Sequence, residues 1–201
     1  VGYPDKVNLA WDANDMRLAL VWHGAFIDAS RHWNGRGQGF EAPLGDHLIE
    51  LAPNAPLAKL ASPNDPWPTT LARESGFRFL GYKLDAKQQP TFRYSFSGVT
   101  VEDQPTPLKA DGQPFASLRR TLTVAGSATE PLYYRAAVAS KIEKLAEGEY
   151  KLDGFWTMKL NATNNNGGEA ATLRQAGGKW ELLVPVNLSG GKAVLTQDYM
   201  W

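Results

Sequence analysis

The feature that most constrains this chain is an alternation of apolar and polar residues in short segments separated by Gly, Pro, Asn and Asp. Successive side chains of a strand point to opposite faces of a sheet, so the alternation predicts half-buried β-strands. Val7–Asp12 alternates and predicts a peripheral strand, whereas Arg17–His23 contains a run that is apolar on both faces and predicts a central strand. Asn14 and Asp15 between them suit a hairpin connection.

Further strands follow from the same alternation, and a change of parity at Gly81 predicts a bulge. The spacing of residues 140–145 fits a single helical turn as well as a strand. Turn residues recur every 8 to 12 residues or so without a fixed internal repeat, which favours an antiparallel β-sandwich over a propeller. A large sandwich of the mutarotase-like type is one form that this all-β pattern allows. The further predicted strands are 77–84, 91–96, 100–102, 117–124, 132–139, 155–160, 170–174, 180–187 and 193–199.

The chain has 201 residues, of which 43% are hydrophobic. A chain of this length and composition can bury a single core, so we expect one domain spanning residues 1–201. Within it, residues of about 34–76 are rich in Gly and Pro and predict a long irregular region. Long loops on a strand scaffold often carry function, because their groups stay exposed while the scaffold positions them.

Composition excludes several classes of function. The 21 basic residues are matched by 21 acidic ones, so the basic surplus that nucleic acid binding requires is missing. There is no cysteine, which excludes disulfides, thiolate nucleophiles and covalently attached c-type haem in this chain. No apolar run approaches the roughly 18 residues of a membrane span. We therefore expect no nucleic acid partner, no membrane span and no cofactor in this chain.

Most of the side chains that could bind a ligand or take part in a reaction lie in the stretch 22–37, which holds two of the three histidines. Aromatic planes beside charged and polar side chains suit a glycan or a partner module, although tryptophans also serve as buried apolar anchors. An Asp28, Ser30 and His32 triad is disfavoured, because catalytic triads draw their members from separate elements, and no residue is assigned a catalytic role. The predicted binding rim consists of Trp22, His23, Asp28, His32, Trp33 and Arg36.

This stretch and the residues shortly after it also contain candidate metal ligands, because imidazole and carboxylate groups bind zinc, iron or manganese. The candidate ligands lack the spacing of a known metal motif, so no metal is predicted. Half-buried histidines that bond to carbonyl groups explain the pattern equally well. These candidates are His23, Asp28, His32, Asp46 and His47.

Several segments of the first half of the chain together carry a family resemblance: 7–12, 17–28, 33–37, 79–85, 90–94 and 98–99. They resemble a β-rich accessory domain found with haem c-binding and sorbosone-dehydrogenase-like modules in large exported bacterial proteins. The resemblance implies an extracytoplasmic location, periplasmic or secreted, and a c-type cytochrome or dehydrogenase module as partner. It also implies a link to the oxidation or capture of carbohydrate-like substrates, with haem c in a partner module. It carries no catalytic residue onto this chain.

Three functional hypotheses follow. The leading one is a non-catalytic binding or docking module of an exported multidomain redox or carbohydrate-processing protein, with a glycan or a protein module on the rim. The second is a sugar epimerase or lyase on a β-sandwich, in which His23 or His32 would transfer protons at a ring carbon. The third is a structural subunit that holds a c-type cytochrome in an assembly.

Overall fold

The computed structural model describes residues 1–33, 41–110, 112–163 and 171–201. Within these residues the chain forms fifteen strands, one helical turn of α type and one 3₁₀ turn. The strands pair into three antiparallel sheets of three, eight and four strands. The predicted all-β, sandwich-like fold is therefore confirmed.

The eight-stranded sheet forms one layer and buries only one of its faces. In β6, β7 and β8 the buried and less buried residues alternate along the strand, as the sequence pattern predicts. Its strands, in spatial order, are β10 (Ile142–Ala146), β11 (Glu149–Leu152), β12 (Trp156–Thr163), β15 (Lys192–Met200), β8 (Ser117–Gly126), β7 (Val99–Leu108), β6 (Pro90–Phe96) and β5 (Arg78–Leu84).

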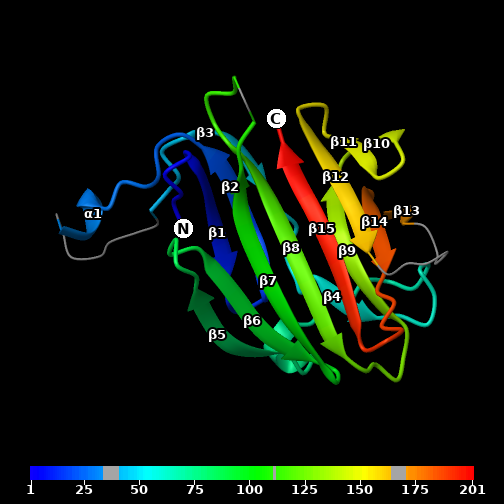
Figure 1. The fold of residues 1–201 in the computed structure, drawn as a ribbon. Helices are drawn as coiled ribbons and strands as arrows, with labels where there is room; N and C mark the ends of the chain where they lie inside the picture. Colours follow the sequence, from blue (N-terminus) through cyan, green and yellow to red (C-terminus); the bar gives the residue numbers. More distant parts are fainter. Residues whose placement is uncertain (34–40, 111, 164–170) are drawn as a thin grey trace.

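The two smaller sheets lie on the buried face of the eight-stranded sheet and form the second layer (Figure 1). Hydrogen bonds from both of them reach that face. Trp11 of the three-stranded sheet donates to Asp103 at 2.9 Å, and Tyr134 of the four-stranded sheet donates to Gln197 at 2.5 Å. The three-stranded sheet is β1 (Val7–Asp12), β2 (Arg17–His23) and β3 (Asp46–Glu50), and the four-stranded sheet is β13 (Thr172–Ala176), β14 (Lys179–Pro185), β9 (Leu132–Ala139) and β4 (Leu57–Lys59).

Several local predictions are confirmed. β1 lies at the edge of its sheet and β2 lies between β1 and β3, in agreement with the peripheral and central patterns of the two segments. The register between β5 and β6 shifts between Phe79 and Gly81, which is the predicted bulge. The ambiguous segment 140–145 is a strand, since β10 pairs with β11.

The structure differs from the sequence predictions in several places, one of which is β11, a strand where none was predicted. The region 34–76 contains β3, β4 and the 3₁₀ turn η1 (Ala72–Glu74), so it is less irregular than predicted. The strand predicted at 100–102 extends as β7 to Leu108 and includes Pro105 and Pro107. The pairing of β7 with β6 ends at Asp103, and both prolines lie beyond that residue. Their missing N–H groups therefore cost no hydrogen bond to β6.

Candidate functional site

Between β2 and β3 the chain leaves the sheets and forms an arm, whose described parts are residues 24–33 and 41–45 (Figure 1). Ile27 and Pro43 form an antiparallel bridge across the arm, and the Leu44 N–H donates to the Phe26 carbonyl at 3.1 Å. The outer part of the arm is α1 (Ser30–Trp33), a single turn. These contacts give the arm backbone a defined shape away from the sheets.

Large apolar side chains are exposed on this arm. Trp33 is 86% exposed, Leu44 56% and Phe26 41%. Exposed apolar groups that gather on one projecting segment are typical of interaction sites, whereas scattered ones are ordinary. The arm therefore presents a large aromatic anchor to solvent.

Polar members of the predicted rim also lie on the arm. Asp28 is exposed, and its Oδ1 atom accepts a hydrogen bond of 2.9 Å from the Ser30 N–H at the start of α1. His32 is exposed, and its Nε2 atom lies 3.6 Å from a carboxylate oxygen of Glu41. Arg36 lies outside the described residues.

Trp22 and His23, by contrast, are buried at the base of the arm, with exposed fractions of 2% and 7%. The Trp22 Nε1–H donates to the Ala25 carbonyl at 2.9 Å, and the indole stacks on the Phe26 ring with centroids 5.9 Å apart. Trp22 ends the β2 run that is apolar on both faces, and His23 follows it as the last residue of the strand. They support the arm from below and are not surface groups.

The surroundings of His23 explain its protonation state. Its Nε2 atom lies 3.0 Å from the Ala116 carbonyl, and its ring centroid lies 3.7 Å from that of Trp201. Burial lowers the pKa of His23 below its usual value; the Ala116 carbonyl opposes this effect, and the nearby His47 adds to it. We therefore assign a neutral imidazole at pH 7 that donates its Nε2–H to Ala116.

A glycine fixes how closely the arm returns to β2. A Cβ atom added at Gly45 would lie 1.7 Å from the His23 carbonyl oxygen and 2.9 Å from the Ala25 carbonyl oxygen. No side chain fits that space without movement of the backbone. Gly45 therefore allows β3 to begin directly beside the end of β2.

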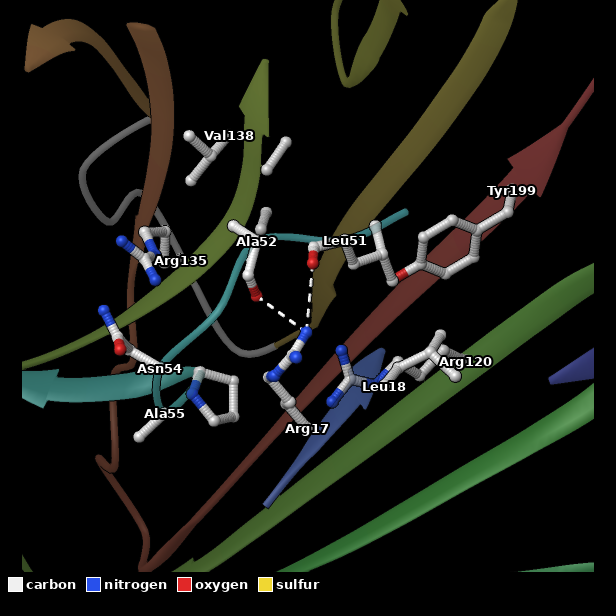
Figure 2. A pocket seen from close by; sticks show the side chains of 13 residues that line it. Arg17, Leu18, Leu51, Ala52, Asn54, Ala55, Arg120, Arg135, Val138 and Tyr199 are labelled. Carbon is white, nitrogen blue, oxygen red and sulfur yellow. Dashed lines mark hydrogen bonds between the residues drawn. The ribbon is translucent and has the colours of Figure 1, made fainter. Parts of the chain in front are cut away.

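Among the cavities that the described residues form, three lie away from the arm. The smallest of these, of about 30 Å³, lies where the three sheets meet and is called the seam cavity below (Figure 2). A second, of about 170 Å³, is bounded by Trp67, Phe77 and Phe96 and is largely apolar. The third, of about 190 Å³, lies between the N-terminal segment at Asp5 and the β7–β8 connection. The predicted rim residues that the structure describes line none of these three cavities.

A buried polar cluster crosses the core beside the seam cavity. Arg120 donates two hydrogen bonds to Asp103 and one of 3.1 Å to the Tyr134 hydroxyl, which in turn donates to Gln197. All four side chains have exposed fractions of 4% or less. We call Asp103, Arg120, Tyr134 and Gln197 the core polar network.

This network was not among the predicted sites, although the alternation of residues along β7 and β8 indicates it. Arg120 continues the apolar series Leu118, Leu122 and Val124, so its position in the alternation places it on the buried face. Asp103 follows Val99 and Val101 in the same way. A charged residue in phase with apolar neighbours on a strand marks a buried, partnered charge.

In the part of the chain that the structure describes, no three or more His, Asp and Glu side chains gather where they could hold a metal ion. Among the candidate ligands, His23 and His47 lie close to each other, with ring centroids 5.9 Å apart, but no third such side chain of the described residues joins them in a group that could hold a metal. Within the same residues no helix has the length and apolar character to cross a membrane. Comparison of the chain with protein-family models, curated proteins and solved structures finds no match.

Proposed function

We propose that this chain is a non-catalytic docking module of an exported multidomain redox or carbohydrate-processing protein, and that the arm between β2 and β3 binds a partner module. The observation that carries the proposal is the 86% exposure of Trp33 on a segment that projects from the sheets. Tryptophan is the residue most enriched at the energetic centres of protein interfaces, because one side chain removes a large apolar area from water.

The structure of the arm suits docking for a second reason. Trp22 and Gly45 fix its base, and the bridge from Ile27 to Pro43 fixes its middle. A segment that is ordered before binding loses less conformational entropy when it binds. Exposed Asp28 and His32 beside Trp33 supply the polar rim that surrounds an apolar anchor in most interfaces.

Catalysis by the same residues has less support. His23 is buried and its ring nitrogen is occupied by the Ala116 carbonyl, so a sugar ring could not approach it without rearrangement. His32 is exposed on α1 and lines none of the three cavities. A general base needs a bound substrate within hydrogen-bonding reach, and neither histidine lines any of the three cavities described above.

The partner follows from the sequence resemblance, which implies a c-type cytochrome or dehydrogenase module in an extracytoplasmic setting. The test is calorimetric titration of this chain with a purified c-type cytochrome module and a purified dehydrogenase module of the kind that the resemblance implies. We expect Trp33→Ala to weaken binding by 30-fold or more, which corresponds to about 2 kcal/mol for an interface hot spot. Leu145→Ala removes a 56% exposed apolar side chain from the distant β10 and should leave the affinity unchanged.

Equal affinities of wild-type protein and Trp33→Ala for the partner would refute docking through the arm. A panel of oligosaccharides titrated in parallel distinguishes the glycan alternative. Glycan binding that is lost in Trp33→Ala, without any binding of the protein modules, would replace the docking assignment by a carbohydrate-binding one.

A further inference from the structure

The seam cavity is lined by one arginine from each of the three sheets. Arg17 comes from β2, Arg120 from β8 and Arg135 from β9 (Figure 2). Other lining side chains are mainly small or apolar, among them Leu18, Leu51, Ala52, Ala55 and Val138. Guanidinium groups on chain segments this far apart in sequence meet only because the sheets pack, so the cavity is a product of the tertiary fold.

Each arginine that lines this cavity has one carboxylate partner. Arg120 pairs with Asp103, and Arg17 lies 3.6 Å from Asp12. Arg135 shares Glu181 with Arg174, which does not line the cavity, and the two contacts measure 3.1 Å and 2.6 Å. The Glu181 carboxylate is therefore divided between two guanidinium groups, so the charge of Arg135 is only partly neutralised.

Arg17 also has a donor without an acceptor. Its Nη1 atom donates to the carbonyl groups of Leu51 and Ala52, each at 3.0 Å (Figure 2). Its Nε atom is buried and makes no hydrogen bond to the described residues, since the Asp12 oxygen at 3.6 Å is too distant. A buried charged donor without a partner is costly, so an acceptor at this position would stabilise the folded chain.

The electrostatics of Arg135 point the same way. Burial lowers the pKa of Arg135 below its usual value; Glu181 opposes this shift, and the positive charges of Arg174 and Arg17 contribute to it. The arginines therefore repel one another across the seam. A negative charge between them would relieve this repulsion, which a neutral water molecule does far less well.

We propose that the seam cavity binds a small monovalent anion of halide size, held by Arg17 together with the guanidinium groups of Arg120 and Arg135. The size of the cavity sets the class of ligand. About 30 Å³ is room for roughly two water-sized species, since one water needs about 10–15 Å³ on this measure. Chloride and bromide are single-atom anions of the size that this space holds.

Anion binding here would stabilise the junction of the three sheets. A ligand that binds only the folded state raises the folded-to-unfolded ratio in proportion to its concentration above its Kd. The experiment measures urea unfolding of the whole chain in sodium chloride and in sodium gluconate at equal ionic strength, because gluconate is too large for the cavity. We expect each tenfold increase in chloride above the Kd to raise the folding equilibrium constant of the wild-type protein about tenfold relative to gluconate.

Two variants separate site binding from general salt effects. Arg17→Met removes the arginine with the free donor and should abolish the difference between chloride and gluconate. Arg73→Met removes an exposed arginine from η1, which does not line the seam cavity. This variant should retain the difference in stability between chloride and gluconate. A chloride effect of the same size in Arg17→Met and in the wild-type protein would overturn the proposal.

Crystals of the wild-type protein grown in bromide provide a test that does not depend on the folding of any variant. The expected result is an anomalous peak in the seam cavity within contact distance of Arg17. Water alone in that cavity, with bromide present in the crystal at high concentration, would equally overturn the proposal. Both readouts are independent of the proposed docking function, because no residue of the arm lines the cavity.

Discussion

Arg120 donates hydrogen bonds of 2.9 Å and 2.7 Å to the two carboxylate oxygens of Asp103, in the interior between the two layers of the sandwich. This bidentate pair joins β7 to β8, and Trp11 of β1 donates a further bond of 2.9 Å to the same carboxylate. Desolvation of two charges is costly, and good geometry with additional hydrogen bonds offsets that cost.

Removal of one member of this pair should be strongly destabilising. Arg120→Met leaves the Asp103 carboxylate buried without its cation, and we expect a loss of about 3–5 kcal/mol in the free energy of unfolding. The double variant Arg120→Met with Asp103→Leu should recover a large part of this loss, because no buried charge remains. Urea unfolding checks both, and a loss below about 1 kcal/mol for Arg120→Met would show that the carboxylate finds another partner or a proton.

The glycine at the base of the arm gives a second prediction. Gly45→Ala places a Cβ atom in the space of the His23 carbonyl oxygen, so backbone must move and the expected loss is about 1–3 kcal/mol. Gly2→Ala is the matched control, since its added Cβ would meet the side chains of Asn8 and Phe26 at 3.1–3.2 Å, and side chains can shift. Thermal or urea unfolding gives the comparison; equal losses in the two variants would contradict the tight closure of the arm.

Stability should depend on pH through His23. Its pKa is lowered in the folded chain and is near 6.5 in the unfolded chain, so between these values the unfolded state binds more protons. The free energy of unfolding therefore falls as pH drops through about 6.5, until pH passes below the folded-state pKa. His23→Gln keeps a donor for the Ala116 carbonyl but cannot titrate, and it should flatten this part of the profile.

The control for this measurement is His32→Gln on the exposed arm, which should keep the slope of the wild-type protein. Urea unfolding between pH 7.5 and 5.0 provides the profiles. If His23→Gln retains the wild-type slope, other groups are responsible for it.

The edge strand β5 is a further place where one substitution should have a visible effect. It carries three exposed apolar side chains, those of Phe79, Tyr82 and Leu84. It is the last strand of the eight-stranded sheet, so among the described residues one of its backbone edges has no neighbouring strand. Charged residues on such edges hinder pairing with other chains. Lys83→Val should therefore increase concentration-dependent self-association, measured by sedimentation velocity.

Lys151→Val is the matched control, because β11 is paired on both sides and offers no open edge. It should leave the sedimentation profile unchanged. Self-association of both variants to the same extent would indicate a general effect of lost charge and not an effect of the strand edge.

The sequence predicted much of this fold because half-buried strands leave a direct trace in the alternation of side chains. β1, β2 and β9 have the predicted bounds, and the Gly81 bulge was visible from parity alone. The short strands β3 and β4 were missed, since three to five residues among glycines and prolines give too little alternation to detect. Their pairing depends on distant strands, which a local pattern does not contain.

The candidate site was only partly predictable for a related reason. The exposure of Trp33 depends on the arm leaving the sheets, which a sequence pattern does not specify. The burial of Trp22 was visible in principle, because it ends the run whose two apolar faces predicted a central strand, whereas His23 follows that run as a polar residue. The convergence of Arg17, Arg120 and Arg135 could not be predicted, since it arises only where three sheets meet.

The position of β15 has a consequence for folding. Residues 192–200 lie between β12 and β8 and are hydrogen bonded to both. Without this strand the large sheet would be two separate ribbons, one ending at β12 and one at β8, each with an open backbone edge. Closure of the sheet therefore depends on contacts of high sequence separation, which form slowly and leave those two edges open to pairing with other chains until they form.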